Sequence, residues 1–432
     1  MKLVLIQPSH HVGGREIHKS KRAWMPRLTL PLLAALTPPD VEVSIVDEYV
    51  DEVDFDREVD LVGITAMTLQ ATRAYQIADC FRRRGVRVVM GGHHVSVFPE
   101  EAIQHCDAVV IGEAEEVWPT VIEDLAGGRA KPFYQGDGHP NLQGLPVPRL
   151  SLLPLEVYFL PYRPVQTMRG CPYGCDFCAV TSFFGGTLRL RPVEEVVRDV
   201  REAGSRWIIF VDDNIAVHPR HARELFQALI PLGIRWVSQG NISIGWEAEL
   251  LELAARSGCV SLLIGIESTS RRKLQLMGKP FNRPERYQEA LRNIRAAGIL
   301  VLATMIVGLD EDDETVFDET VQFLERNRVP LAFFSIYTPL PGTRARARLQ
   351  EQGRIMDGDW SRYDFAHAVF QPKQLSPQAL EEGYWRAFQQ FYSIPSMVKR
   401  LLFPPQPKLR LALTGNLLCR YGVKHRSHPL FG

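Results

Sequence analysis

Three of the seven cysteines in this chain lie within eight residues, at Cys171, Cys175 and Cys178. A Cys-x3-Cys-x2-Cys spacing lets one loop present three thiolates to one face of a cubic iron–sulfur cluster. Structural zinc needs a fourth cysteine or histidine at similar spacing, but the next ones along the chain are His218 and Cys259. The spacing therefore predicts a [4Fe–4S] cluster with one open iron, and zinc is the weaker alternative.

The segment Arg169–Cys178 resembles the signature of the radical S-adenosylmethionine (SAM) superfamily, and Phe177 matches the aromatic residue usual before the third cysteine. The resemblance covers about residues 165–340. It implies that the amino and carboxylate groups of SAM chelate the open iron. An electron from the cluster then cleaves SAM to a 5′-deoxyadenosyl radical, which takes hydrogen from an unactivated carbon.

The same resemblance implies contacts to SAM from polar residues at the ends of the next three strands: Asp212, Asp213, Asn214, Ser238, Gln239 and Glu267. A carboxylate at Asp212 or Asp213 would face the methionyl ammonium. Glu267 could accept hydrogen bonds from two ribose hydroxyls. The alternative for each is structural, because such residues also cap strands and begin loops.

The N-terminal part resembles cobalamin-binding domains. The Ser-x-Leu motif of that family appears as Thr65-Ala66-Met67, and its Gly-Gly pair appears as Gly91-Gly92. Glycines there let the nucleotide tail of cobalamin approach the backbone closely. The resemblance therefore implies that Thr65, Met67, Gly91 and Gly92 bind cobalamin. The alternative is a generic doubly wound domain whose glycines serve turns.

A third motif of that family, Asp-x-His-x-x-Gly, carries the histidine that ligates cobalt from below. His11 and Gly14 fit the spacing, but Ser9 stands where the Asp should orient the histidine. A histidine that binds a metal usually needs such an acceptor on its other ring nitrogen. We therefore expect cobalamin binding to survive the loss of His11, and the lower ligand of cobalt stays open.

The elements that must position these residues alternate apolar runs with amphipathic stretches. In residues 1–128, runs such as Leu3–Gln7 and Leu61–Thr65 alternate with helical patterns such as Ala71–Arg84. This α/β alternation predicts a doubly wound, Rossmann-like parallel sheet. Six later strand–helix units are fewer than the eight of a closed barrel and predict a partial (β/α)6 TIM-type barrel.

The pattern divides the chain into four regions: a cobalamin-binding-like domain at 1–128, a proline-rich linker at 129–164, the radical SAM partial barrel at 165–340, and a small helical, basic C-terminal region at 341–432. The six predicted barrel strands are Val165–Met168, Trp207–Val211, Arg235–Gln239, Ser261–Ile266, Val301–Ile306 and Ala332–Tyr337.

The composition is that of a globular chain, with 45% apolar and 23% charged residues among 432. An odd, clustered set of cysteines fits a reducing compartment better than a secreted disulfide framework, so we expect a cytoplasmic protein. No apolar run reaches the length of about 18 residues that predicts a transmembrane helix.

Residues 383–432 contain no Asp or Glu and eight basic residues: Arg386, Lys399, Arg400, Lys408, Arg410, Arg420, Lys424 and Arg426. Basic amphipathic helices can lie on an anionic membrane surface, which predicts a peripheral membrane contact. The alternative is that this region covers the open barrel, since apolar stripes at helical spacing are usually core.

A cobalamin-binding-like domain directly before a radical SAM barrel resembles the large class of cobalamin-dependent radical SAM enzymes. The most populated activity of that class, methylation of an unactivated carbon, is the predicted function. One SAM would methylate the cobalt and a second would generate the radical. The alternatives are an oxidoreductase or cyclase that uses cobalamin without methyl transfer, and a non-catalytic cobalamin- or redox-sensing protein.

The predicted partners follow from this interpretation. The substrate is expected to be a small molecule, and a hydrophobic one such as an isoprenoid or a tetrapyrrole if the C-terminal region meets a membrane. An electron donor such as a flavodoxin or a ferredoxin is expected to reduce the cluster. No nucleic-acid partner is expected.

Overall fold

The structure is a computed structural model that describes residues 1–12, 16–19, 25–158 and 160–426. The chain divides into two compact units. The first comprises residues 1–165, 182–205 and 359–361, and the second comprises residues 166–181, 206–358 and 362–432.

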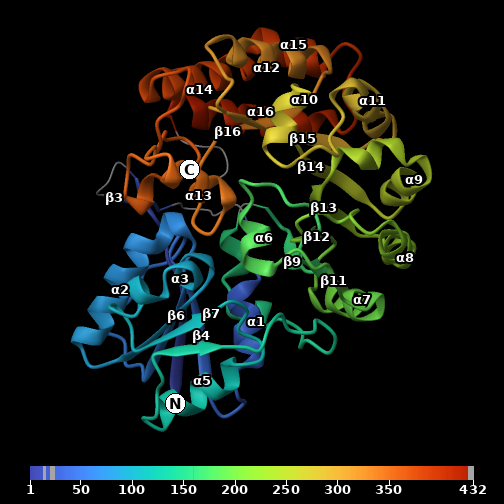
Figure 1. Cartoon of the computed structure of the whole chain (residues 1–432). Helices are drawn as coiled ribbons and strands as arrows, with labels where there is room; N and C mark the ends of the chain where they lie inside the picture. The colour runs from blue at the N-terminus through green and yellow to red at the C-terminus, as the bar shows by residue number, and fades with distance from the viewer. Residues whose placement is uncertain (13–15, 20–24, 159, 427–432) are drawn as a thin grey trace. The chain divides into compact units, whose positions relative to one another are not determined.

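The first unit is built on a six-stranded sheet in the order β4-β1-β5-β6-β7-β8, with every pair of neighbours parallel (Figure 1). Its strands are β1 (Lys2–Gln7), β4 (Glu42–Asp47), β5 (Leu61–Thr65), β6 (Arg87–Gly91), β7 (Ala108–Ile111) and β8 (Phe133–Gln135). The strand order reverses at β1, between β4 and β5. Ligands of such sheets bind beyond the carboxyl ends of the strands at this reversal. The predicted doubly wound sheet is confirmed.

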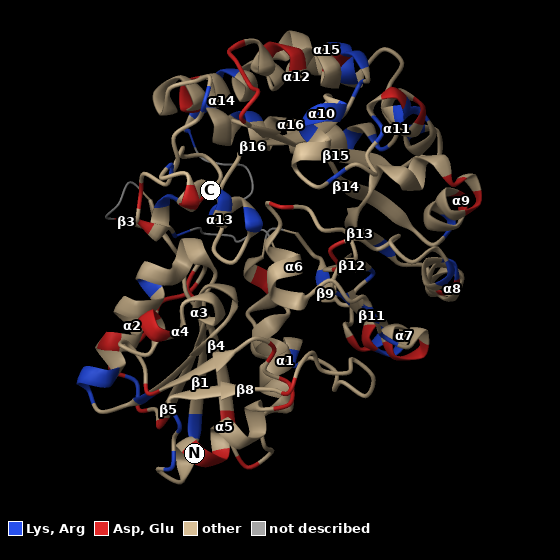
Figure 2. Ribbon diagram, viewed as in Figure 1, with Lys and Arg blue, Asp and Glu red and all other residues tan. Residues whose placement is uncertain are grey.

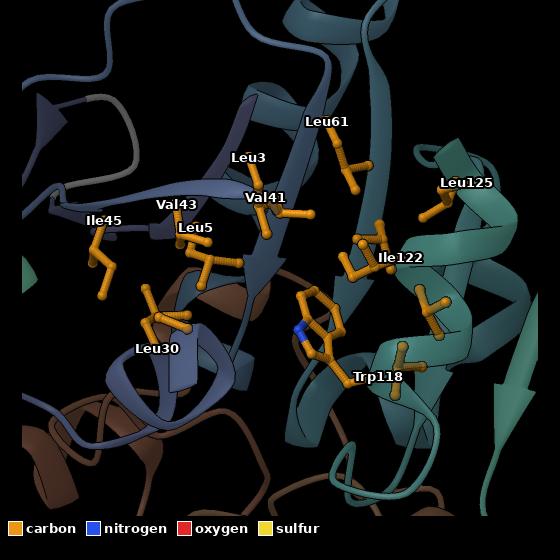
Figure 3. Close-up of a cluster of buried hydrophobic side chains, with 14 of the residues drawn as sticks. Leu3, Leu5, Leu30, Val41, Val43, Ile45, Leu61, Trp118, Ile122 and Leu125 are labelled. Carbon is orange, nitrogen blue, oxygen red and sulfur yellow. The ribbon is translucent and has the colours of Figure 1, made fainter. Parts of the chain in front are cut away.

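Helices cover both faces of this sheet: α1 (Thr29–Leu36) and α5 (Trp118–Ala126) on one, α2 (Ala71–Arg83), α3 (His93–Val97) and α4 (Pro99–Ala102) on the other. Leu3 and Leu5 of β1 point to the first face, where they meet Leu30 and Trp118 (Figure 3). Burial on both faces explains why the strands are continuous apolar runs in the sequence.

The proline-rich segment 129–164 has few regular elements: β8, the short turns η2 (Leu150–Leu152) and η3 (Leu155–Val157), and β9 (Arg163–Val165). Leu153 and Tyr158 of this segment join the core of the first unit. The Tyr158 hydroxyl also donates a hydrogen bond to the carboxylate of Asp47 at 2.9 Å. Apolar burial therefore makes much of this segment part of the first unit.

The second sheet has six strands in the order β16-β15-β14-β13-β12-β9 and does not close on itself. The strands that follow β9 are β12 (Trp207–Phe210), β13 (Arg235–Gly240), β14 (Cys259–Glu267), β15 (Leu300–Val307) and β16 (Leu331–Ile336). The connecting helices are α8 (Pro219–Leu229), α9 (Ala248–Arg256), α11 (Tyr287–Ala296) and α12 (Thr315–Arg326). The predicted open, six-stranded barrel is confirmed.

The first predicted barrel strand, 165–168, is divided in the structure into β9 and β10 (Met168–Arg169). The backbone N–H groups of Thr167 and Met168 donate to the carboxylate of Asp212, at 2.7 and 3.1 Å. These two N–H groups therefore bind a side chain and not a neighbouring strand. The apolar pattern of the sequence predicted one continuous strand and did not show this interruption.

The C-terminal region consists of four main helices: α13 (Arg344–Glu351), α14 (Pro377–Phe391), α15 (Ile394–Leu401) and α16 (Leu409–Lys424). Phe388 of α14 packs edge-on against Phe334 of β16, with ring centroids 4.9 Å apart. The Tyr392 hydroxyl donates to the carbonyl of Ala332 at 2.8 Å. The inner side of this region is therefore core of the second unit. None of the helices in the described ranges has the length and apolarity needed to cross a membrane.

Candidate functional site

The three clustered cysteines follow β10 in the second unit, and all are free and partly buried. Burial is the main cause that raises the pKa of each thiol, to about 12 for Cys175 and about 11 for Cys178. The nearby Cys171 raises both further. Ionising these thiols is therefore costly unless a metal centre takes the thiolates, and such a centre would release their protons.

The number of ligands bears on whether a cluster or a single metal ion binds here. The cysteine loop supplies three thiols, at Cys171, Cys175 and Cys178. Structural zinc needs four ligands around one ion, whereas each thiolate of a cubic cluster binds its own iron. The donor set therefore fits an iron–sulfur cluster better than zinc.

Asp176, between the second and third cysteines, anchors this loop to the second unit. Its carboxylate accepts hydrogen bonds from the Arg348 guanidinium at 2.6 Å and from the Tyr337 hydroxyl at 3.2 Å. Its backbone carbonyl accepts from the N–H of Ala345 at 3.0 Å. These contacts come from α13 and from Tyr337, directly after β16, so residues more than 160 positions later in the chain hold the loop.

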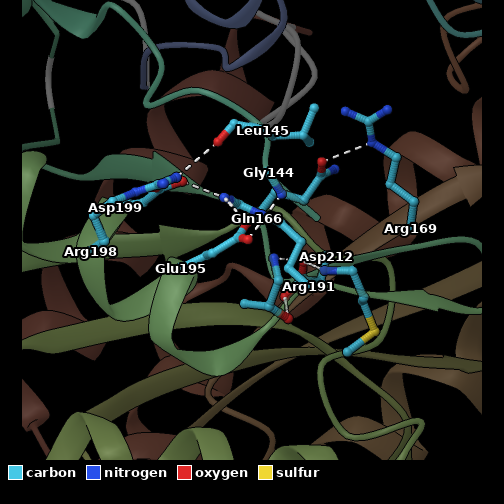
Figure 4. A network of polar contacts seen from close by, with 11 residues as sticks. Gly144, Leu145, Gln166, Arg169, Arg191, Glu195, Arg198, Asp199 and Asp212 are labelled. Carbon is cyan, nitrogen blue, oxygen red and sulfur yellow. Dashed lines mark hydrogen bonds and ion pairs between the residues drawn. The ribbon is translucent and has the colours of Figure 1, made fainter. Parts of the chain in front are cut away.

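Asp212, at the end of β12, contacts its own chain. Besides the two backbone donors described above, its carboxylate accepts from the Thr167 hydroxyl at 2.7 Å. Burial raises the pKa of Asp212 to about 7, against the opposing effect of these hydrogen bonds. Figure 4 shows Asp212 beside the segment that carries Gln166 and Arg169, which leads into the cysteine loop. Asp212 is thus placed to fix the approach to the cysteines.

Asp213 differs from its neighbour. Burial raises the pKa of Asp213 to about 6. Its charge raises the thiol pKa of Cys171 and Cys178, so the carboxylate lies near the cysteine loop. In the described part of the chain, no other side chain donates a hydrogen bond to it. Of the two adjacent carboxylates, Asp213 is the one available to a ligand.

Of the candidate SAM contacts near β13, two are hydrogen-bonded within the chain and one is open to a ligand. The Ser238 hydroxyl donates to the carbonyl of Phe210 at 2.9 Å. Asn214 accepts from the backbone N–H of Asn241 at 3.2 Å and joins the ends of β12 and β13. Gln239 is exposed at the strand end. Ser238 and Asn214 are thus held by their own chain, and Gln239 is open.

Glu267 ends β14 in a backbone conformation that side chains rarely adopt, with φ +63°. The β14–β15 register shifts between Gly265 and Glu267, as at a β-bulge. Bulges and left-handed residues re-aim side chains and gather at functional sites. The Glu267 carboxylate is buried and accepts from Lys279 at 2.8 Å and from the Thr304 hydroxyl at 3.0 Å.

The cobalamin candidates lie at the carboxyl ends of β5 and β6 in the first unit. Gly92 has φ +99°, and a Cβ atom there would stand 2.8 Å from the carbonyl of Ala66 and 2.9 Å from the hydroxyl of Thr65. Gly91 is less restricted, since its Cβ would meet Val110 at 3.6 Å. Gly92 is therefore required by its own chain, and Gly91 is free to be approached by a ligand.

Met67 projects from the same edge, with 57% of its surface exposed. Its backbone N–H donates to the side chain of Gln70 at 3.1 Å, and Gln70 also donates to the carbonyl of Pro8 at 2.6 Å. The ends of β1 and β5 are thus tied together at the reversal of strand order. Met67 presents an exposed side chain, and Gly91 a partly exposed residue without a side chain, at the place where doubly wound sheets bind ligands.

The candidate lower-ligand motif begins after β1. Ser9 is buried and its backbone N–H donates to Glu48 at 3.0 Å. His11 lies in the short strand β2 (His11–Val12), and within the described residues no side chain hydrogen-bonds its ring. Gly14 lies outside the described residues. The acceptor that would orient a cobalt-bound His11 is therefore not found in the described part of the chain.

Two family models match the sequence: the Radical SAM superfamily over residues 165–324 and the B12 binding domain over residues 32–122. The bacteriochlorophyllide d C-12(1)-methyltransferase of Chlorobaculum tepidum is 31% identical over 416 residues, which cover 94% of this chain and 90% of the relative. This chain belongs to the cobalamin-binding radical SAM family.

Two further relatives of this radical SAM enzyme are named as a methyltransferase and as a cyclase. The bacteriochlorophyllide d C-8(2)-methyltransferase of Chlorobaculum tepidum is 29% identical over 93% of this chain and 94% of its own. The anaerobic magnesium-protoporphyrin IX monomethyl ester cyclase of Cereibacter sphaeroides is 26% identical over 93% of this chain and 71% of its own.

A solved structure shows the same fold. The cobalamin-dependent SAM radical enzyme OxsB, with aqua-cobalamin and SAM bound, superposes with a TM-score of 0.70 over 98% of this chain and 72% of that chain, at 16% identity. At the level of the two domains, the predicted [4Fe–4S] cluster, SAM and cobalamin are confirmed as the cofactors of this radical SAM enzyme.

The sequence did not indicate the residues that support these sites. Thr167 lies 45 residues before Asp212, and Arg348 lies 172 residues after Asp176. Lys279 lies 12 residues after Glu267, beyond helix α10 (Arg271–Leu276). None of these residues forms a short motif with its partner, so only the folded chain shows the pairs.

Proposed function

We propose that this radical SAM enzyme is a cobalamin-dependent C-methyltransferase that acts on a hydrophobic tetrapyrrole. The observation that carries the proposal is nearly full-length similarity, at 31% identity, to a protein named for methylation of bacteriochlorophyllide d. An exposed apolar face in the C-terminal region also suits an enzyme whose substrate is poorly soluble in water.

We assign the cofactors as follows. Cys171, Cys175 and Cys178 hold the cluster, and Asp213 and Gln239, which the geometry leaves available, contact SAM. Glu267 also contacts SAM: each of its oxygens accepts one hydrogen bond within the chain and keeps a lone pair for a ribose hydroxyl. Asp212, Asn214 and Ser238 position these contacts, because their polar atoms are already used within the chain. Thr65, Met67 and Gly91 face cobalamin, and Gly92 holds the turn that shapes this edge.

We assign the domains to the cofactors in the same way. Residues 1–128 bind cobalamin, and residues 165–340 bind the cluster and SAM. Residues 341–432 pack mainly in the second unit. When bound, the cluster and SAM supply a 5′-deoxyadenosyl radical, and cobalamin supplies a methyl group. Ionised Asp213 accepts a hydrogen bond from the methionyl amino group, and Glu267 accepts from the ribose. The buried, rigid strand ends fix these acceptors, so the chain contributes mainly orientation and exclusion of water.

The test is anaerobic reconstitution with iron, sulfide and cobalamin, followed by assay with SAM, a low-potential reductant and bacteriochlorophyllide d. A methyltransferase forms both S-adenosylhomocysteine and 5′-deoxyadenosine, because one SAM gives its methyl group and another gives the radical. The matched control is Cys178→Ala, which should form no 5′-deoxyadenosine. If the protein contains its cluster and cobalamin but forms neither product, the enzyme hypothesis is rejected in favour of a non-catalytic sensor.

The second candidate is an oxidation or ring-forming activity without methyl transfer. It is favoured by the 26% identity to a magnesium-protoporphyrin ester cyclase over 93% of this chain. The same assay separates the two activities. The cyclase activity would form 5′-deoxyadenosine with no S-adenosylhomocysteine.

The electron donor and the compartment belong to the same proposal. All seven cysteines are free thiols, which fits a reducing compartment such as the cytoplasm. We infer that a one-electron donor such as a flavodoxin or a ferredoxin reduces the cluster. Reduction by a purified flavodoxin system in place of a chemical reductant tests this assignment.

We propose that the exposed apolar residues of the C-terminal region form a face that lies on an anionic membrane surface. Its exposed apolar residues are Ile394, Val398, Phe403, Leu411, Leu417, Leu418 and Tyr421. Tyr421 is 69% and Leu417 57% exposed on α16. Residues 383–432 contain basic but no acidic residues. Figure 2 shows basic residues in α15, of which Lys399 is exposed and Arg400 buried, and Arg410, Arg420 and Lys424 on α16 are exposed. Apolar side chains between exposed cations suit a surface of anionic lipid.

Sedimentation with vesicles tests this contact. The wild-type protein should bind anionic vesicles at low salt, be released by high salt, and ignore zwitterionic vesicles. Leu417→Ser combined with Tyr421→Ser should abolish binding. The control is Leu276→Ser, which removes an apolar residue that is 58% exposed outside this region. Equal binding by both variants, or no binding by the wild type, would leave this face without a membrane role.

A further inference from the structure

The segment 277–282, which follows α10, packs directly against the cysteine loop. The backbone N–H of Asp176 donates to the carbonyl of Met277 at 2.9 Å. The rings of Tyr173 and Phe281 stack, with centroids 3.9 Å apart and planes 21° from parallel. A hydrogen bond and an aromatic pair therefore fix this segment to the loop that carries the cysteines.

Lys279 lies in the middle of this segment as half of a buried ion pair. Its ammonium is 2.8 Å from the Glu267 carboxylate, and the two side chains are 10% and 8% exposed. A Cβ atom at Gly265 would stand 2.6 Å from the Lys279 nitrogen, so the ammonium lies against the end of β14. A buried pair held this closely keeps its charges in fixed places, where solvent screens them little.

Gly278, next to Lys279, touches the cysteine loop itself. A Cβ atom at Gly278 would stand 2.6 Å from the carbonyl of Gly174, the residue before Cys175. The Lys279 ammonium also lies over the ring of Phe281, 6.0 Å from its centroid, and Phe281 is the ring that stacks on Tyr173. Lys279 therefore holds its charge beside the loop that carries the cysteines.

We propose that Lys279 is a positioning residue that raises the reduction potential of the [4Fe–4S] cluster held by the cysteines. In the reduction step the cluster takes one electron from a low-potential, one-electron donor, so its negative charge grows by one. A fixed ammonium in surroundings of low dielectric constant stabilises that added charge, and it also favours the thiolate ligands. The inference rests on the proposed function, because it requires the cluster.

The test compares midpoint potentials of reconstituted variants, measured by redox titration with detection of the reduced cluster by electron paramagnetic resonance. Lys279→Met should lower the potential so that the reduced fraction falls about tenfold at a fixed potential, or about 59 mV for one electron. Lys279→Arg, which keeps the charge, should stay close to the wild type. The matched control is Arg272→Met, because Arg272 is 80% exposed and its charge is screened.

A second variant keeps the inference testable if Lys279→Met fails to load iron. Glu267→Gln removes the opposing charge and should move the potential in the opposite direction, toward easier reduction. An unchanged midpoint potential in Lys279→Met with its full iron content would overturn the role of Lys279. If Lys279→Met does not bind iron, an unchanged midpoint potential in Glu267→Gln would overturn it. Absence of iron from the wild-type protein would instead reject the proposed function, so the two failures are distinct.

Discussion

The carboxylate of Asp212 accepts hydrogen bonds from both the backbone N–H and the hydroxyl of Thr167, each at 2.7 Å. Thr167 lies four residues before Cys171, so this contact joins the end of β12 to the segment that enters the cysteine loop. The adjacent carboxylate of Asp213 lies near the cysteines instead. Two neighbouring residues of one type thus have different roles.

The first prediction separates these roles. Asp212→Ala should lower the stability of the second unit and its iron content, because three buried donors lose their acceptor, at about 1–3 kcal/mol each. Asp213→Ala should keep the iron content, weaken SAM binding and leave the thermal midpoint at neutral pH equal or higher, because it removes a carboxylate whose burial raises its pKa. Thermal unfolding, iron analysis and anaerobic SAM titration measure the three effects. The reverse pattern would show that the roles are exchanged.

The second prediction concerns pH. Burial raises the pKa of Asp213 to about 6, from an ordinary value of 3.8. As the pH falls through 6, the carboxylate takes up a proton in the folded protein. The neutral carboxyl group then no longer attracts the amino group of SAM. SAM affinity should therefore decrease below pH 6 and level off above it.

Asp213→Asn is the control for this pH dependence. It should bind SAM weakly at all these pH values, with a flatter profile, because the titrating group is gone. The free energy of unfolding changes with pH in the opposite direction. The pKa of this carboxyl is lower in the unfolded chain, which therefore holds fewer protons, so protonation of Asp213 favours the folded state as the pH falls. Affinity that rises with acidity would contradict the assignment of Asp213.

The third prediction concerns the glycine pair. Gly92→Ala should destabilise the first unit by about 1–3 kcal/mol, because the residue has φ +99° and its Cβ would press on the carbonyl of Ala66. Gly91→Ala should fold normally and keep cobalamin, as read from its visible absorption, because the added Cβ would point at buried Val110, at 3.6 Å. Normal stability of Gly92→Ala would show that this glycine is needed only for the ligand.

The fourth prediction concerns Arg400, a fully buried side chain of α15. Its guanidinium donates to the carbonyls of Val329, Pro330 and Phe391 and to the side chain of Asn416, at 2.8–3.0 Å. Arg400→Met leaves the carbonyls of Val329 and Phe391 and the side-chain oxygen of Asn416 without this donor, whereas Pro330 still accepts from Asn416, and should cost about 3 kcal/mol or more.

The readout for Arg400 is thermal unfolding together with hydrogen exchange in α14 and α16. Arg410→Met is the matched control, because Arg410 is an exposed cation of the same region. It should change stability by less than about 0.5 kcal/mol. Equal stability of the two variants would argue that the C-terminal region is not held by Arg400.

The sequence was sufficient for features that are local. Apolar runs such as Leu61–Thr65 predicted strands because parallel strands are buried on both faces. The spacing of Cys171, Cys175 and Cys178 predicted the cluster because one loop carries all three. Both kinds of signal depend on residues that are neighbours in the chain.

The sequence was insufficient where a role depends on distant partners. Asp212 and Asp213 are equivalent in the sequence, and only the position of Thr167 shows which of them is engaged. Gly92 was predicted to serve a ligand, whereas its close contact is with Ala66 of its own chain. Arg400 was counted among membrane-facing charges, but it is buried against the carbonyls of Val329 and Pro330, directly before β16.

Transfer of the methyl group from SAM to carbon is the central claim, and SAM with a trideuterated methyl group tests it most directly. The reconstituted wild-type protein, bacteriochlorophyllide d and a low-potential reductant would be incubated anaerobically, and the pigment would be analysed by mass spectrometry. The account predicts a product that has gained one methyl group with all three deuterium atoms, and no such product from Cys178→Ala. A pigment that is oxidised or cyclised without deuterium, while 5′-deoxyadenosine accumulates, would contradict methyl transfer.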